Sequence, residues 1–183
     1  ITEMEIKEIY FFFQSNILKI IKIFSITKKY SVIKTNSIYS FILTSASIID
    51  INSTGVEDLI KELYHNGMQL VLASSSANVT IDRVFRRFGL HQYFTHIVSG
   101  EDFPKSKPHP AIFQHAASLS KAPKENCIVI EDSANGIQAA VAAGIFCVGY
   151  DSINSKDQDL SKANIIIHHF NELNLEKVRL LKS

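Results

Sequence analysis

Apolar and polar positions along the chain follow two periods, which predict where helices and strands lie. From Ile6 to Phe24, apolar side chains recur at helical spacing, which indicates an amphipathic helix. From Gly55 onward, short apolar runs alternate with segments of helical period. The expected strands are 68–73, 96–98, 127–130, 145–148 and 163–167, and the expected helices are 56–66, 78–88, 110–120, 134–143 and a last one from 171. Uniformly apolar strands that alternate with helices are typical of a parallel sheet with helices on both faces, so the predicted fold class is α/β.

The first 50 residues differ in composition from the rest of the chain. Residues 1–54 contain no Gly, no Pro and a single Asp, at position 50. Within them, Ser37 to Ile51 is rich in β-branched and aromatic residues, which is typical of a strand. We therefore expect two parts: a divergent, mostly helical segment at 1–50 and an α/β core at 51–183. Because the chain begins with Ile1 rather than Met, we expect a fragment or a processed form.

Composition narrows the classes of function. The chain has 183 residues, of which 46% are hydrophobic and 20% are charged, as in an ordinary globular domain. A formal net charge of +1 does not point to nucleic acid, and polar residues interrupt the apolar stretch 9–26, which argues against a membrane span. Cys127 and Cys147 show no disulfide or zinc spacing, so we expect buried free thiols in a cytoplasmic protein. We expect a monomer or a weak dimer.

Two adjacent carboxylates mark the first candidate site. Glu131 and Asp132 directly follow the apolar run that ends at Ile130, so both fall at the end of a buried strand. Carboxylates at such a position are costly unless a cation meets them, and carboxylate oxygens at the carboxyl edge of a parallel sheet suit Mg²⁺. The alternative is a helix N-cap made by Asp132 or Ser133, with Glu131 facing the solvent. That alternative explains one carboxylate more easily than two.

Hydroxyl groups and a lysine indicate an anion site near these carboxylates. Ser74, Ser75 and Ser76 lie between a predicted strand and the helix that Asn78 begins, where hydroxyls and backbone N–H groups can bind phosphate. The alternative for these serines is simple helix capping. Lys107 lies in the proline-rich loop 104–110, which would hold its charge in place for a phosphoryl group. A solvated loop lysine is the alternative, and Lys105 could serve in its place.

Taken in this order on an α/β scaffold, the motifs resemble those of the haloacid dehalogenase (HAD) superfamily. VLASSS is similar to the family's second motif, SKPHP to the third and VIEDSANGIQAAVAAG to the fourth. The resemblance covers Gly55 to the end and is greatest to β-phosphoglucomutase-like enzymes and sugar-phosphate phosphatases. It implies a Rossmann-like core, a small phosphorylated substrate and Mg²⁺ held by Glu131 and Asp132. It also implies that Ser74 binds phosphate and that Lys107 orients the phosphate and the nucleophile.

The family's first motif, Asp-x-Asp-x-Thr after a first strand, is missing. Asp50 has a Thr at suitable spacing, but Asn52 stands where the second aspartate belongs, so we prefer a nucleophile that lies upstream or has been lost. Residues 1–50 would then be a cap or a divergent replacement for one. Because the missing strand is central in the family's sheet, part of Ser37 to Ile51 should fill its place.

Two functions therefore stay open. One is a Mg²⁺-dependent phosphatase or β-phosphoglucomutase-like enzyme that acts on a sugar phosphate or a similar metabolite. The other is a truncated or degenerate HAD-like protein that binds Mg²⁺ and phosphate without catalysis. An interaction module whose motifs match by chance is a third possibility, which the shared order of the motifs argues against.

Overall fold

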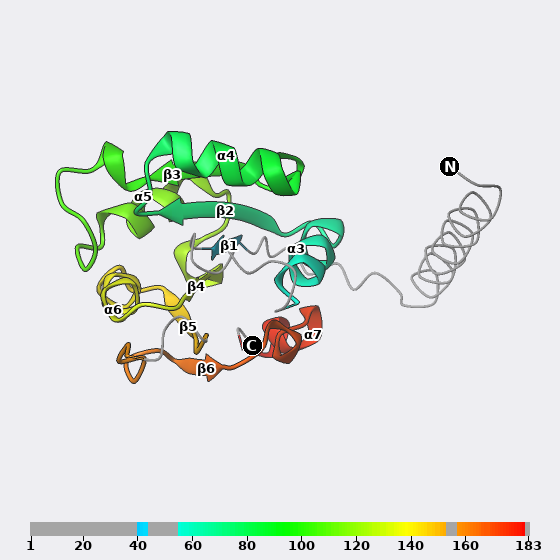
Figure 1. The fold of residues 1–183 in the computed structure, drawn as a ribbon. Coiled ribbons are helices and arrows are strands. Elements are labelled where there is room, and N and C mark those ends of the chain that lie inside the picture. The colour runs from blue at the N-terminus through cyan, green and yellow to red at the C-terminus, as the bar shows by residue number, and fades with distance from the viewer. Residues whose placement is uncertain (1–39, 44–54, 153–156, 182–183) are drawn as a thin grey trace, which may run out of the picture. The chain divides into compact units, whose positions relative to one another are not determined.

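The computed structural model describes residues 40–43, 55–152 and 157–181, with the backbone alone for 40–43, and all of them belong to a unit formed by residues 37–183. Within these residues the strands make one parallel sheet, which Figure 1 shows running from β3 at the top to β6 at the bottom. The order of the strands is β3-β2-β1-β4-β5-β6. They comprise β1 (Ser40–Leu43), β2 (Gln69–Ser74), β3 (His96–Ser99), β4 (Cys127–Glu131), β5 (Phe146–Tyr150) and β6 (Ile165–Ile167).

The central position of the sheet is filled by β1. Leu43 pairs with Leu72 of β2 on one side and with Ile130 of β4 on the other. This confirms the prediction that part of Ser37 to Ile51 takes the place of the missing strand. It also places a strand that lies within the first 50 residues at the centre of the α/β sheet.

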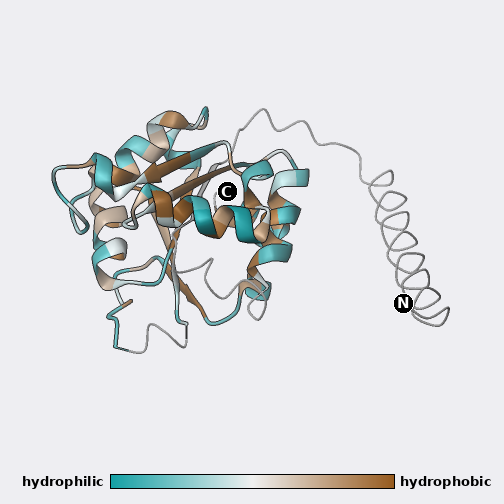
Figure 2. Cartoon of the chain, turned by 45° about the horizontal axis from the view of Figure 1, so that its top comes forward, coloured by the Kyte–Doolittle hydropathy of each residue, from teal (hydrophilic) through white to brown (hydrophobic). Residues whose placement is uncertain are grey.

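Helices cover both faces of the sheet, as the apolar strands predict. They comprise α3 (Val56–His65), α4 (Asn78–Phe88), α5 (Ala111–Leu119), α6 (Ala134–Ala142) and α7 (Leu175–Leu180). One apolar core contains side chains of α3, α4 and α7, and the other contains side chains of α5 and α6. Alternate residues of β2, β4 and β5 enter opposite cores. In Figure 2 the strands are brown, and the helices carry teal on their outer faces. None of the described helices has the length and apolar composition needed to cross a membrane.

The predicted elements after Gly55 are all present, with small shifts at the C-terminal end. The last strand is shorter than predicted and covers Ile165–Ile167. The last helix begins at Leu175 rather than near residue 171, because Phe170–Glu172 first forms a 3₁₀ turn. Asn174 then caps α7, since its side-chain oxygen accepts a hydrogen bond from the backbone N–H of Lys177 at 2.8 Å.

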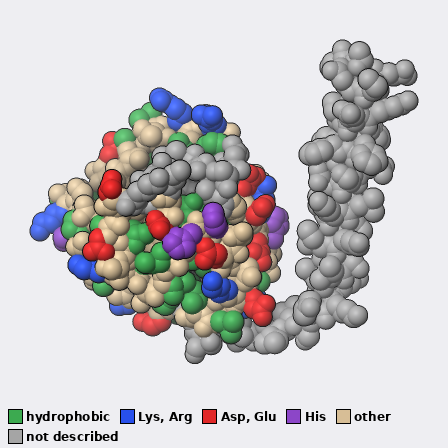
Figure 3. Space-filling model, turned by 60° about the horizontal axis from the view of Figure 1, so that its bottom comes forward, with side chains coloured by type: hydrophobic (Ala, Val, Ile, Leu, Met, Phe, Trp, Pro, Cys, Tyr) green, Lys and Arg blue, Asp and Glu red, His purple; other side chains and the backbone are tan. Residues whose placement is uncertain are grey.

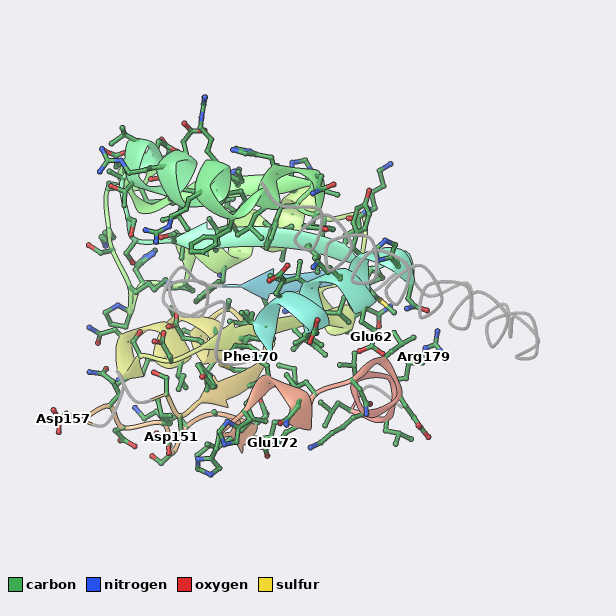
Figure 4. The ribbon with its side chains drawn as sticks, turned by 45° about the vertical axis from the view of Figure 1, so that its right-hand side comes forward. Glu62, Asp151, Asp157, Phe170, Glu172 and Arg179 are labelled. Atoms are coloured by element: carbon green, nitrogen blue, oxygen red, sulfur yellow. The ribbon has the colours of Figure 1, made fainter. Side chains whose placement is uncertain are left out.

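Charged and histidine side chains gather near β6 and the 3₁₀ turn, at the edge of the sheet. Asp151 and Glu172 lie near each other there in Figure 4, and Figure 3 shows histidines beside acidic side chains on the face that it brings forward. His168 Nδ1 lies 3.1 Å from Asp151 Oδ2, with both side chains largely exposed. Glu172 accepts hydrogen bonds from the backbone N–H groups of His168 and His169 at 2.7 and 2.8 Å. These contacts describe a solvated strand end, at which His168 and His169 are exposed.

Candidate functional site

The predicted site segments meet at the carboxyl edge of the sheet. β2 ends at Ser74 and β4 ends at Glu131, and the two strands flank β1. Since neighbouring strands lie about 4.8 Å apart, the two strand ends are separated by roughly 10 Å, a span that a phosphoryl group and a cation can bridge. The loop between β3 and α5 carries Lys107 to the end of β4. Residues that are far apart in the sequence thus lie around one edge.

Lys107 forms a buried ion pair with Glu131. Its Nζ donates a hydrogen bond to Glu131 Oε2 at 2.8 Å, and the two side chains are 9% and 2% exposed. The ammonium group also lies 4.8 Å from the ring centroid of Phe113, a cation–π contact. A buried ion pair requires close geometry and further hydrogen bonds, because both charges have lost their water. The interpretation of Lys107 as a solvated loop lysine is therefore wrong.

The second carboxylate oxygen of Glu131 is also fully engaged. Oε1 accepts hydrogen bonds from the backbone N–H groups of Asp132 and Ser133 at 2.9 and 3.1 Å, and from the Ser133 hydroxyl at 3.1 Å. Burial by itself would raise the pKa of Glu131, but Lys107 and the hydrogen bonds with Asp132 outweigh it and lower the pKa below its ordinary value. Ser133 is the N-cap of α6, since its hydroxyl accepts a hydrogen bond from the N–H of Gly136 at 3.1 Å. The helix thus has its cap while Glu131 faces inward.

Gly136 makes room for the Glu131 carboxylate. A Cβ built on Gly136 would lie 1.9 Å from Oε2 and 2.0 Å from Cδ of Glu131, well inside any van der Waals contact. The side chain of Glu131 therefore occupies the space that a side chain at position 136 would need. The first turn of α6 and the ion pair at the end of β4 fit together only because position 136 is glycine.

Asp132 is the second buried carboxylate at the end of β4. It is 7% exposed, and within the described ranges no Lys, Arg or His forms an ion pair with it. Burial, followed by its interaction with Glu131, raises the pKa of Asp132 to about 7. Within the same ranges no three His, Cys, Asp or Glu side chains come together as a metal site. A Mg²⁺ ion held by Asp132 and its neighbour would have to take its other ligands from water and phosphate, as Mg²⁺ commonly does.

The serine loop after β2 is held by its own hydrogen bonds. Ser74 is fully buried, and its hydroxyl accepts a hydrogen bond from the backbone N–H of Ser76 at 3.0 Å. Ser75 is exposed and Ser76 is half-buried. The Ser74 hydroxyl keeps its own O–H as a donor, because a hydroxyl can donate one bond and accept two. The loop thus presents hydroxyl groups at the edge on the opposite side of β1 from Glu131.

Asn78 has a partner that the sequence analysis missed. Its backbone N–H, the first of α4, donates a hydrogen bond to Glu101 Oε2 at 2.7 Å. Glu101 lies in the short 3₁₀ turn Gly100–Asp102 that follows β3, and 23 positions separate it from Asn78. Local patterns do not reveal this pairing. One signal could have indicated it: if β2 and β3 are neighbours, the loops that follow them lie side by side at the carboxyl edge of the sheet.

The nucleophile remains without a described candidate. Asp50 lies outside the described residues, as do the cap assigned to the N-terminal segment and the helix predicted near the start. The sequence contains no Asp before Asp50, and the residues that follow Leu43 are Thr44, Ser45, Ala46 and Ser47.

Comparison with known proteins gives a consistent family assignment. The profile of the haloacid dehalogenase-like hydrolase family matches residues 1–150. The chain is 33% identical over 137 residues to the bifunctional riboflavin kinase/FMN phosphatase of Arabidopsis thaliana, an alignment that covers 74% of this chain and 36% of the relative. It is 32% identical over 122 residues to the beta-phosphoglucomutase of Bacillus subtilis, covering 67% of this chain and 51% of that protein.

Solved structures give the same result. The structure of CbbY from Rhodobacter sphaeroides in complex with phosphate superposes with a TM-score of 0.64 at 28% identity, over 68% of this chain and 57% of that one. The beta-phosphoglucomutase of Clostridium difficile superposes with a TM-score of 0.60 at 31% identity, over 69% of this chain and 54% of that one. The chain spans about half or less of the length of the curated relatives it matches.

Proposed function

The chain belongs to the haloacid dehalogenase-like hydrolase family, and on that premise we propose that it binds a small phosphorylated metabolite and transfers its phosphoryl group with the help of Mg²⁺. The substrate class we propose is sugar phosphates and similar monoesters, handled as by a phosphatase or a β-phosphoglucomutase. The observation that carries this proposal is the buried Lys107–Glu131 pair, 2.8 Å long, with Asp132 directly beside it. Relatives that are named as phosphatases and as a phosphoglucomutase support it.

Lys107 supplies positive charge in a fixed position. An ammonium group has three N–H donors, and the hydrogen bond to Glu131 uses one of them. Among the described residues this group donates no further hydrogen bond, so another N–H would donate to a phosphoryl oxygen at the edge of the sheet. Because the pair is buried, the charge of Lys107 is screened little by solvent and acts strongly on an anion that enters the site.

Ser74 and Asp132 would act on the two sides of the phosphoryl group. The Ser74 hydroxyl, on the β2 side, donates to a phosphoryl oxygen and fixes the orientation of the group. Asp132, with Glu131 next to it, holds Mg²⁺ on the β4 side. When it is bound, this ion would shield the phosphoryl charge so that an anionic nucleophile can approach.

A second candidate function rests on the central strand. In the family, the nucleophilic aspartate follows the first strand, and here β1 fills the place of that strand. Residues 44–47, which come next in the sequence, include no carboxylate. That observation favours a protein that binds phosphate and Mg²⁺ without turnover, unless Asp50 or another carboxylate supplies the nucleophile.

Hydrolysis and binding assays on the full chain separate the two candidates. We would measure phosphate release from β-glucose 1-phosphate, phosphoglycolate and FMN with Mg²⁺, and compare the wild type with Asp50→Asn. Turnover that this change abolishes assigns the nucleophile to Asp50, and turnover that it leaves intact excludes Asp50. No turnover, together with calorimetric Mg²⁺ binding that a Glu131→Gln/Asp132→Asn double variant loses, supports binding without catalysis. Mg²⁺ binding that the double variant retains would contradict the proposed metal site.

A further inference from the structure

The proline-rich loop brings Lys107 close to Phe113, a residue in the first turn of α5. Two short turns lie between them. The backbone N–H of His109 donates to the carbonyl oxygen of Ser106 at 3.0 Å, which closes the first turn. The N–H of Phe113 donates to the carbonyl oxygen of Pro110 at 3.1 Å, which closes the second. The Lys107 ammonium group lies over the Phe113 ring, 4.8 Å from its centroid, so the contact is local to this loop and the start of the helix.

Both partners of this contact are removed from solvent. The Lys107 side chain is 9% exposed, and Phe113 is fully buried in the core that contains side chains of α5 and α6. The face of an aromatic ring carries negative potential and attracts a cation above it, most strongly where water is excluded. The surroundings of Lys107 and Phe113 are therefore those in which a cation–π interaction contributes most.

The ammonium group is held from two different elements. Glu131, at the end of β4, accepts one of its N–H groups at 2.8 Å, while Phe113 on α5 meets its charge with the face of the ring. An ammonium group ends a flexible four-carbon stem with rotatable donors, so a single hydrogen bond still lets it turn about that bond. Two contacts from different directions restrict this rotation and set the direction in which Lys107 can meet an anion.

We propose that Phe113 is a positioning residue of the anion site, whose ring face holds the Lys107 ammonium group toward an incoming phosphoryl group. This inference rests on the proposed function, because it assumes that Lys107 donates to that group. It goes beyond that function by giving a buried phenylalanine a part in anion binding, through the charge that it faces, in addition to its part in packing.

Calorimetric titration of the full chain with inorganic phosphate in Mg²⁺ buffer tests the proposal when the ring is fluorinated. Fluorine withdraws electron density from the ring face and weakens its attraction for a cation, while it changes the volume of the side chain little. Monofluorinated and trifluorinated phenylalanine at position 113 should weaken phosphate binding in that order, by at least about threefold for the trifluorinated form. Phe113→Leu, which removes the ring, should weaken it by about tenfold.

Phe85 provides the matched control. It is 1% exposed in the other apolar core, where its ring contacts those of His91 and Phe94 rather than a lysine. Phe85→Leu should lower thermal stability as Phe113→Leu does, because both remove a buried ring, but it should change phosphate affinity by less than about twofold. Trifluorinated phenylalanine at position 85 should leave phosphate affinity equally unchanged.

Urea unfolding tests the same contact without phosphate. Trifluorination at position 113 should lower the urea midpoint of the otherwise native chain. It should lower the midpoint less in Lys107→Met/Glu131→Gln, where both charges of the ion pair are absent. An equal loss in both backgrounds, or a phosphate affinity that fluorination at position 113 leaves unchanged, would overturn the proposal. Failure of the proposed function shows differently: the wild type then binds no phosphate, whatever the midpoints are, and this inference falls with it.

Discussion

Replacing Gly136 by Ala tests whether the Glu131 carboxylate really occupies the space beside α6. Helix propensity alone predicts that Gly136→Ala stabilises the protein by about 0.5–1 kcal/mol, because glycine loses the most backbone entropy on folding. The structure predicts the opposite sign. A Cβ would lie 1.9 Å from Oε2, 2.0 Å from Cδ and 2.4 Å from Cγ of Glu131, so the whole end of that side chain must move.

The expected size of the effect follows from what Glu131 loses when it moves. The carboxylate is 2% exposed and holds Lys107 at 2.8 Å, together with donors from Asp132 and Ser133. Disrupting a buried ion pair costs about 3–5 kcal/mol. After subtraction of the gain in helix propensity, Gly136→Ala should lower the free energy of unfolding by about 2–4 kcal/mol.

Urea unfolding followed by circular dichroism measures this change. Asn135→Ala is the matched control, because Asn135 is exposed in the same turn. Helix propensity alone should raise the free energy of unfolding of this variant by roughly a few tenths of a kcal/mol. In a Glu131→Ala background the clash is absent, so adding Gly136→Ala should be neutral or stabilising. A Gly136→Ala variant as stable as the wild type, or one whose cost persists without the Glu131 side chain, would refute the reasoning.

Three further predictions follow from the same contacts. Lys107→Ala should lower the free energy of unfolding by about 3–5 kcal/mol in urea because it leaves Glu131 buried without its cation, whereas Lys105→Ala in the exposed part of the loop should change it by less than about 0.5 kcal/mol. Asp132→Asn should leave the free energy of unfolding in metal-free buffer unchanged or raise it by about 1 kcal/mol, because it removes a buried charge that has no ion pair among the described residues. A free energy of unfolding lowered by several kcal/mol would show that Asp132 has a strong partner. Burial raises the pKa of the Cys147 thiol from 9.0 to about 12, so the thiol should resist iodoacetamide at pH 8 until urea unfolds the protein. The free energy of unfolding should fall as the pH rises above about 9, because only the unfolded thiol loses its proton there. Labelling of Cys147 in the folded protein at pH 8, read by mass spectrometry, would contradict this.

The fold could be predicted largely from local patterns. The predicted helix 78–88 has the same bounds as α4, because Gly89 is a strong signal for a helix end. In the structure Gly89 adopts the left-handed conformation, with φ 62°. The central strand was predicted by a different argument: two apolar strands would otherwise have had unpaired edges, and Ser37 to Ile51 was the available segment. Its location at Ser40–Leu43 needed the structure, because several registers of that apolar stretch fit the same pattern.

The site was predicted less completely, because its contacts join residues that local periodicity does not connect. The sequence indicated that Lys107 carries functional charge, but not that Glu131 would be its partner 24 positions away. It treated Glu131 and Asp132 as equivalent carboxylates. The pairing of Asn78 with Glu101 and the close approach of Gly136 to Glu131 depend on how loops and helices pack after the sheet has formed. Such contacts arise from tertiary packing, which single-sequence patterns do not encode.

Glu131 and Asp132, the two carboxylates at the end of β4, have different surroundings and therefore different expected roles. Both oxygens of Glu131 are bound, one by Lys107 and the other by three donors, so this side chain mainly holds the lysine in place. Asp132 forms no ion pair with any Lys, Arg or His of the described residues, so it is the carboxylate whose charge a divalent ion would most relieve. A phosphoryl group between Lys107 and that ion would face a positive group on either side, with Ser74 across β1. Such an arrangement would bind a phosphate whether or not a nucleophile is present, so binding and turnover have to be measured separately in this chain.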